Sequence, residues 1–340
     1  MKKTRLGVLA AAFTAALAAR AAAQTSDEIY DESRIASFRF TMSAADWQTL
    51  CDRDTGLWYR ADMTWQPPGG TLETVPGVGL RRSGGGAPNP NVVWYTPRPS
   101  VRVSFNEFEF ANPAGPGSPG RKWHDVNRIK LDSMIGNTDL SMMRDRLAYG
   151  ILRAAGASAP RACHARVYVN GDFKGLWTVE EPVRKDFTRQ RWGEDGGNLY
   201  EMEYGGSDAY DWRGTDPASY VQSPFQEHNN SPGGNYADLV ELINIVNNGG
   251  NQIRSRLNAH IHMDRFLSYL AATTAYGDND DIVHWGGGSN NHYWYHRASS
   301  NLMELIKWDP GASMGMYEPD FGIAKGQSPL GYRYGSQKIT

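Results

Sequence analysis

This sequence has few cysteines, no surplus of basic charge and no long apolar run beyond its first residues. Its 340 residues include Cys 2, with Lys+Arg 35 against Asp+Glu 37 and a formal net charge of -2. Two cysteines are too few for a disulfide scaffold, and in an oxidising compartment Cys51 and Cys163 either pair or stay as thiols. Nucleic-acid binding depends on a basic field, which this chain lacks. After residue 23 no apolar stretch reaches the roughly 18 residues of a membrane span.

Residues 1–23 have the pattern of a cleavable secretory signal peptide. A basic start (Met1 to Arg5) precedes an apolar segment (Leu6 to Ala19), and Ala21 to Ala23 supply small residues for cleavage. Cleavage removes four basic residues and no acids, which changes the formal charge from -2 to -6. We therefore expect a secreted, periplasmic or cell-surface protein with no membrane span after cleavage.

The first half of the mature chain is rich in strand signals. Alternation of apolar and polar residues predicts strands over 34–42 and 100–110, and the second is the clearest strand signal in the chain. Ser43 is a typical N-cap for a helix over 44–51. Residues 66–90 contain many glycines and prolines, which predicts a loop-dominated segment with only a short strand over 78–81.

A further strand, a helix and a hairpin follow. Residues 127–131 favour a strand, and Asn170-Gly171 is a strong type I′ turn signal between strands over 166–169 and 176–181. A helix is expected from Asp139 or Ser141 to Ala155. Helical spacing gives that helix an apolar face of Met142, Leu147, Ile151 and Leu152.

The second half carries helix signals over 236–248 and 263–276, a loop over 277–290, and strands over 292–296 and 302–308. A strand-rich region (24–200) therefore precedes a helix-bearing region (201–340). This order does not fit alternating βα units and indicates a two-lobed α+β protein.

Oxygen-bearing side chains lie at the ends of these later elements. Asp280 lies in the loop after an apolar helix, Asn291 opens an aromatic strand, and Asp309 follows another strand. Such oxygens are the ligands that Mg²⁺ and similar hard cations prefer, and a free carboxylate nearby can orient or deprotonate a hydroxyl. A solvated acidic loop with an Asp turn is the alternative interpretation.

In the first half, Lys130 is on a predicted strand and Asp145 is on the next helix, so they could form a buried pair directed at a nucleotide. Two ordinary surface charges would give the same pattern. The segment 77–86 combines glycines with two arginines and could cradle a phosphate, but it matches no standard phosphate-loop motif, and its composition favours a mobile loop.

Taken in chain order, a series of short motifs resembles the CotH kinase family, the spore-coat-protein-H-like atypical protein kinases. The resemblance covers about residues 29–315, and although each motif alone is weak, their shared order is fairly specific. The main motifs are Val78-Gly-Leu-Arg, Arg98-Pro-Ser-Val-Arg-Val-Ser-Phe-Asn, Ile129-Lys-Leu-Asp-Ser, Gly175-Leu-Trp-Thr-Val-Glu-Glu-Pro, Gly277-Asp-Asn-Asp-Asp, Asn291-His-Tyr-Trp-Tyr-His and Trp308-Asp-Pro-Gly.

The resemblance implies a reduced protein-kinase fold that uses ATP and a divalent metal, Mg²⁺ or Mn²⁺, to phosphorylate Ser in protein substrates. By position, Asp280 would be the catalytic carboxylate that orients the substrate hydroxyl. Asn291 and Asp309 would hold the metal ions on the phosphates.

Kinase architecture further implies that Lys130 is the nucleotide lysine and Asp145 its helix partner. Arg98 is a rival for the phosphate contact. Glu181 would lead into the linker between lobes, near the adenine.

Some residues depart from the family pattern. Gly311 stands where the family has a second Asp, and Asp278 and Asp281 replace two Asn. The chain could also be a fragment with an incomplete second lobe. We predict an exported kinase acting on Ser or Thr of secreted or surface proteins. A catalytically weak or inactive surface-binding protein and a metal-dependent hydrolase remain alternatives.

Overall fold

The computed structural model describes residues 25–84, 91, 95–108, 120–134, 141–202, 208–221, 224–228, 235–278, 280–282 and 289–314. The predicted signal peptide lies outside these residues. The strands are β1 (Ala36–Met42), β2 (Tyr59–Gln66), β3 (Glu73–Arg82), β4 (Val101–Ser104), β5 (Arg128–Asp132), β6 (Ala162–Val169), β7 (Asp172–Glu180), β8 (Asn198–Met202), β9 (Phe225–Glu227), β10 (His292–His296) and β11 (Met303–Lys307). The α-helices are α2 (Ser26–Ile29), α3 (Ala44–Asp52), α4 (Arg144–Ala154), α5 (Lys185–Trp192), α6 (Ala237–Asn248), α7 (Ile253–His260) and α8 (Met263–Ala275), with 3₁₀ turns η1 (Pro217–Tyr220) and η2 (Gly250–Gln252).

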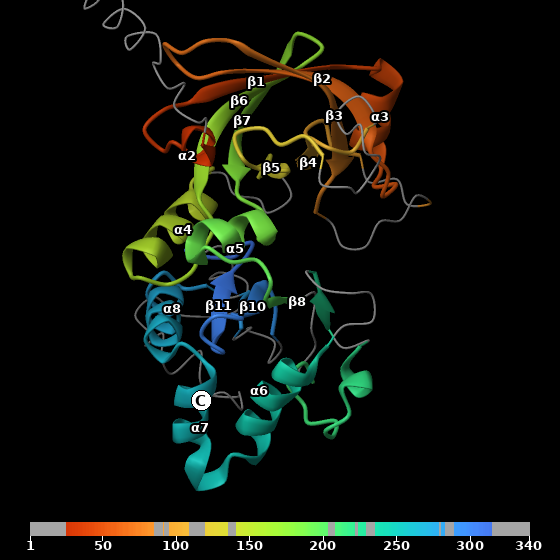
Figure 1. The fold of residues 1–340 in the computed structure, drawn as a ribbon. Coiled ribbons are helices and arrows are strands. Elements are labelled where there is room, and N and C mark those ends of the chain that lie inside the picture. The colour runs from red at the N-terminus through yellow and green to blue at the C-terminus, as the bar shows by residue number, and fades with distance from the viewer. Residues whose placement is uncertain are drawn as a thin grey trace, which may run out of the picture.

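The first half of the chain closes into a β-barrel (Figure 1). Its strands follow the order β1-β2-β3-β4-β5-β7-β6, and parallel pairing of β1 with β6 closes the ring. Alternate side chains point inward, as the period of a strand requires. The interior is filled by large buried side chains, among them Phe38, Phe40, Met63, Trp65 and Trp177.

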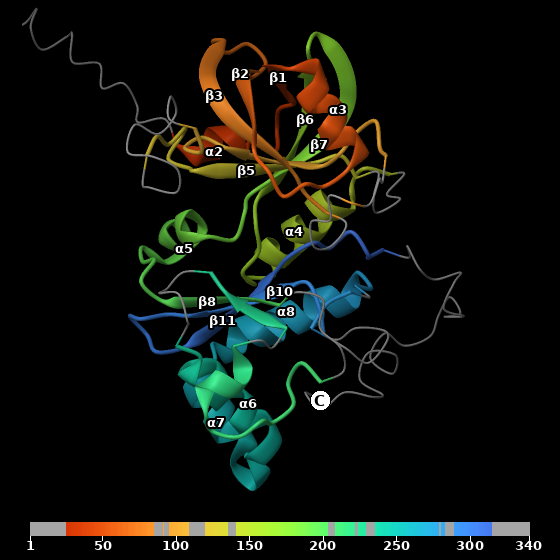
Figure 2. The same ribbon diagram turned by 90° about the vertical axis from the view of Figure 1, so that its right-hand side faces the viewer.

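A separate antiparallel sheet, β11-β10-β8-β9, forms in the later part of the described chain. Figures 1 and 2 both show α4 and α5 between the barrel and this sheet, with α6 and α7 beyond it. One apolar core joins α4 to the second sheet and its helices: Tyr149 and Leu152 pack in the same cluster as Tyr269 and Leu305. The α+β class is confirmed. Among the described residues, no helix is both long and apolar enough to cross a membrane.

Several local predictions are confirmed. Ser43 caps α3, with its side chain accepting a hydrogen bond from the backbone N–H of Asp46. The turn between β6 and β7 has Asn170 at φ 52° and Gly171 at φ 89°, as a type I′ turn requires. Both cysteines are buried free thiols, and Cys163 donates to the carbonyl oxygen of Ile29.

The loop prediction for residues 66–90 holds over 67–72 but is wrong over 73–77, because β3 runs for ten residues from Glu73 to Arg82. Two of its glycines occupy positions in this strand that disfavour other residues. Gly77 has φ 64° beside a β-bulge, and Gly79 lies so close to Trp58 that an added Cβ would come within 3.1 Å of the ring. The predicted strand over 100–110 ends at Ser104, where the N–H of Phe105 turns to the carbonyl oxygen of Asn127.

The helix expected from residue 139 or 141 begins at Arg144, as α4, and of the predicted apolar face it buries Leu152. Its inward residues are Asp145, Ala148, Tyr149 and Leu152, whereas Leu147 is 44% and Ile151 is 41% exposed. The burial of an acidic side chain on this face bears directly on the candidate site. Helices α5 and α7 have no counterpart among the predicted elements.

Candidate active site

Antiparallel pairing of β10 and β11 brings two predicted site residues to one end of the second sheet. His292 pairs with Lys307, so Asn291, just before β10, and Asp309, just after β11, lie at the same edge. The N–H of Trp308 donates to the carbonyl oxygen of Asn291 at 3.1 Å. Asn291 and Asp309 have φ values of 49° and 42°. Left-handed backbone at non-glycine residues is uncommon and often marks a functional site.

The carboxylate of Asp280 forms hydrogen bonds with residues at this end of the second sheet. Its Oδ1 accepts a hydrogen bond from Asn290 Nδ2 at 2.8 Å, and its Oδ2 accepts one from Asn291 Nδ2 at 2.7 Å. Two consecutive amides therefore fix the orientation of one carboxylate. The sequence analysis placed Asp280 and Asn291 in one site, and the structure brings them together.

Lys307 anchors the loop that carries Asp280, and sequence reasoning missed it. Its ammonium group is fully buried and lies 3.0 Å from Asp278 Oδ2, 3.7 Å from Asp281 Oδ1 and 3.0 Å from the carbonyl oxygen of Asp280. Asp278 also accepts from Tyr276, and Asp281 accepts from Tyr269. The two aspartates thus hold the loop through Lys307.

On the barrel side, Lys130 lies between two carboxylates. Its Nζ is 2.8 Å from Asp132 Oδ2 and 3.0 Å from Glu180 Oε2, and Glu180 is its cross-strand neighbour. Burial by itself lowers the pKa of Lys130, but these carboxylates together outweigh burial and hold the pKa well above its usual value. Lys130 is therefore a charged ammonium group, and it lies 4.9 Å from the centre of the Trp308 ring.

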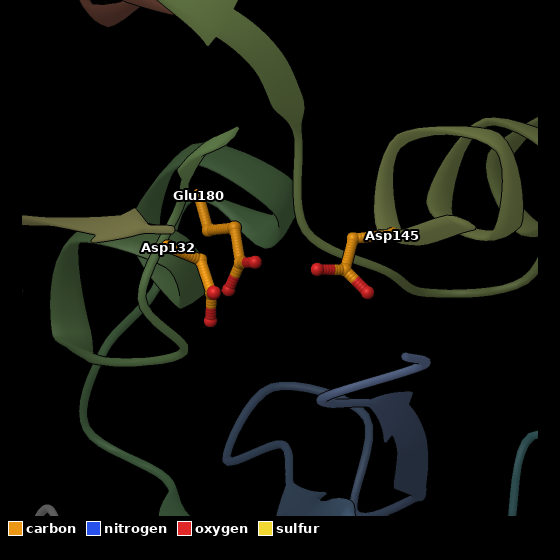
Figure 3. Close-up of side chains that lie close together, drawn as sticks. All are labelled: Asp132, Asp145 and Glu180. Atoms are coloured by element: carbon orange, nitrogen blue, oxygen red, sulfur yellow. The ribbon is translucent and has the colours of Figure 1, made fainter. Parts of the chain in front are cut away.

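Asp145 faces the same group from α4 (Figure 3). One oxygen each of Asp132, Asp145 and Glu180 lies within 4.8 Å of the others. The ion pairs found for Lys130 go to Asp132 and Glu180, two residues that the sequence analysis had not selected, rather than to its predicted partner Asp145. Burial, together with the charges of Glu180 and Asp132, raises the pKa of Asp145 well above its usual value.

Asp309 links the two sides electrostatically. Burial raises its pKa, Lys130 opposes that shift, and the charges of Asp132 and Asp280 reinforce it. Its backbone N–H donates to the hydroxyl of Tyr149 on α4. Groups from the barrel, from α4 and from the second sheet therefore meet around Asp309.

Arg98 and Glu181, the remaining predicted site residues, lie in separate environments. Arg98 Nη2 donates to the carbonyl oxygen of Leu176 at 2.8 Å, so its guanidinium packs on the β7 backbone. Glu181 is buried and accepts from Arg161 Nη2 at 2.6 Å and from Arg191 Nη2 at 2.8 Å. The structure does not bring either side chain into the hydrogen-bonded groups around Lys130 or Asp280.

A small cleft of about 50 Å³ opens between the barrel and the second sheet. Its walls include Lys130, the linker residues Pro182 to Arg184, and Trp308. Lys130 gives the cleft a positively charged side chain. The linker gives it main-chain polar groups.

Comparison with known proteins identifies the family of this chain. The profile of a family described as CotH kinase protein matches residues 95–338, more than half of the chain. The chain belongs to this family.

One curated relative is inner spore coat protein H of Bacillus subtilis (strain 168), which is 24% identical over 183 residues, covering 52% of this chain and 48% of the relative. The chain thus spans about half the length of that protein. Among solved structures, the Helicobacter pylori proinflammatory kinase CtkA matches 58% of this chain and 55% of its own, with 10% identity and a TM-score of 0.30.

Proposed function

We propose that this protein is an exported atypical protein kinase that transfers the γ-phosphate of ATP to Ser or Thr residues of secreted or surface proteins. The observation that carries the proposal is the hydrogen-bonded pair of Asp280 and Asn291, linked through Asp309 to Lys130. Membership in the CotH kinase family supports a kinase-like activity. Export, the nucleotide and the acceptor are parts of the proposal.

The oxygen ligands at this end of the second sheet suit a hard divalent cation. Asn291 turns its amide nitrogen toward Asp280, which directs its amide oxygen to the other side of the group. With the half-buried carboxylate of Asp309, it would offer oxygen ligands to Mg²⁺ or Mn²⁺. A cation held there would neutralise charge on the phosphates of ATP.

The chain's own residues would then position the reactants. Lys130, charged and at the wall of the cleft, would bind phosphate oxygens. The side chain of Glu181 is held by Arg161 and Arg191, so contact with the adenine would come from the linker backbone at 182–184. Asp280, oriented by two amides, would accept or orient the hydroxyl proton of the acceptor.

The test is phosphate incorporation from labelled ATP into an acceptor protein, with Mg²⁺ or Mn²⁺. Asp280→Asn keeps the shape of the side chain and is expected to lower the rate by roughly 10²–10⁴-fold, because it removes a proton acceptor. Asp264→Asn, on an exposed position of α8, is the matched control and should label like the wild type. If wild type and Asp280→Asn label equally poorly, the kinase proposal is rejected.

Gly311 favours a second function, that of a binding protein on the cell surface with little or no catalysis. It stands where the family pattern has a metal-binding Asp. Thermal unfolding with ATP and Mg²⁺ or Mn²⁺ separates the two functions, because a ligand at 100 times its Kd stabilises the folded protein by about 2.7 kcal/mol. A shift in Tm supports the kinase, and no shift with any nucleotide–metal pair supports the binding protein.

Export has its own test. If the signal peptide is cleaved as expected, the protein recovered from outside the cytoplasm begins at Gln24. Recovery of the uncleaved chain from the cytoplasm would reject that part of the proposal.

A further inference from the structure

Three buried carboxylates from three elements converge beside Lys130. Asp132 ends β5, Glu180 ends β7 and Asp145 lies in the first turn of α4. Figure 3 shows the carboxyl group of Asp145 directed across a gap toward Asp132 and Glu180. We propose that these three side chains form a divalent-cation site of their own, beside Lys130 and distinct from the one at Asn291 and Asp309.

The state of Asp145 is the independent observation that points to a ligand. The residue is 2% exposed, and its Oδ1 is buried without a hydrogen-bond partner among the residues that the structure describes. Buried polar atoms in native proteins are almost always paired, and an unpaired one calls for an explanation such as a missing ion. A cation between Asp145 and the other two carboxylates would supply that partner.

The balance of charge points the same way. In the described part of the chain, the acidic groups acting most strongly on Asp145 are Glu180, Asp132 and Asp309, and Lys130 is the only basic group among its main electrostatic influences. Lys130 already pairs with two of these carboxylates. One ammonium group cannot neutralise three buried carboxyl groups and the half-buried Asp309, and a divalent cation would remove most of the excess.

The donor set selects the class of cation. All three ligands are carboxylate oxygens, with no sulfur or imidazole, which suits Mg²⁺, Mn²⁺ or Ca²⁺ rather than Zn²⁺. The oxygens lie within 4.8 Å of one another. Neighbouring oxygens around Mg²⁺ or Mn²⁺ are roughly 3 Å apart, so a modest inward shift of Asp145 would complete the contact.

The test is a Mn²⁺ titration of the whole protein without nucleotide, with free Mn²⁺ measured by electron paramagnetic resonance. We expect Asp145→Asn to weaken one class of Mn²⁺ sites at least tenfold and to leave the other unchanged. Asp309→Asn should have the complementary effect, and Asp264→Asn should bind like the wild type. Mn²⁺ should also raise the Tm of Asp145→Asn less than that of the wild type.

Two outcomes would overturn the proposal: an unchanged titration for Asp145→Asn, or an equal Mn²⁺-induced rise in Tm. Either would mean that Asp145 is only a buried carboxyl group kept neutral by a proton. Because no nucleotide is added, the result is independent of phosphate transfer. The cation site can fail while the kinase assay succeeds, and the reverse also holds.

Discussion

The two sides of the cleft balance their buried charges in different ways. On the second-sheet side, Lys307 lies between Asp278 and Asp281, both of which also accept from tyrosine hydroxyls. On the barrel side, Lys130 pairs with Asp132 and Glu180, while Asp145 Oδ1 has no hydrogen-bond partner within the described part of the chain. The first arrangement is complete without a ligand and fixes a loop. The second has an excess of negative charge and suits cation binding.

Lys307 offers the largest test of this difference. Lys307→Met would leave Asp278 and Asp281 buried without their cation, which we expect to lower the free energy of unfolding by about 3–5 kcal/mol. Combining it with Asp278→Asn and Asp281→Asn removes the uncompensated charges and should restore most of the loss. Urea unfolding of the single and triple variants measures both. A Lys307→Met protein as stable as the wild type would show that this side does not depend on Lys307.

His292 gives the second-sheet side a dependence on pH. Burial lowers its pKa to about 4 from an ordinary value of 6.5, while its Nδ1 contacts the carbonyl oxygen of Asn290. Between these values the unfolded chain binds a proton that the folded protein does not, so acid favours unfolding. We expect the stability that depends on neutral His292, up to about 3 kcal/mol, to be lost as the pH falls from 6.5 to 4. His292→Gln should flatten the urea-unfolding profile in that window, and an unchanged slope would exclude His292 as its source.

Asp145 gives the barrel side the opposite dependence when divalent cations are absent. Burial raises its pKa above that of the unfolded chain, so the folded state binds the extra proton. Its contribution is fully present below the unfolded pKa and is lost as the pH rises through the folded pKa. Asp145→Asn should therefore be more stable than the wild type by roughly 1–3 kcal/mol at pH 7 in EDTA, because the wild type must take up a proton or bury a charge at Asp145 when it folds.

This stability advantage of Asp145→Asn should shrink toward pH 4, where the proton is also bound in about half of the unfolded chains. Urea unfolding at the two pH values measures it, with Asp264→Asn as the control. A wild type that is the more stable of the two at pH 7 without cations would contradict the account of the barrel side.

Local signals explain how much of the fold was predictable. The turn at Asn170-Gly171, the cap at Ser43 and the strands around Asn291 and Asp309 all depend on neighbouring residues. Closure of the barrel does not, because parallel pairing joins β1 to β6 across more than a hundred residues. Composition was misleading at β3, where glycines allow a bulge and a close approach of Trp58 instead of a loop.

The residues of the candidate site also differ in whether local sequence signals could reveal them. Motif order placed Asp280 with Asn291, and the hydrogen bonds between them confirm that they are neighbours. The partners of Lys130 were missed, since Glu180 reaches it only through cross-strand pairing of β5 with β7. Lys307 was missed because a lysine in a strand gives no sign of burial until the acidic loop packs against it.

The smallest expected effect concerns the two cysteines, which lie on the barrel side. A bridge between Cys51 and Cys163 would constrain a loop of about 110 residues and would add roughly 4–5 kcal/mol in the chain-entropy model. The structure instead has two buried free thiols, and burial raises the pKa of Cys51 to about 11 and that of Cys163 to about 12. Both are therefore protonated and unreactive at neutral pH, because the thiolate is the reactive form. We expect a reducing agent to leave the Tm of the purified protein unchanged and both thiols to be alkylated only after unfolding. A clear fall in Tm on reduction would show that the barrel is held by a disulfide.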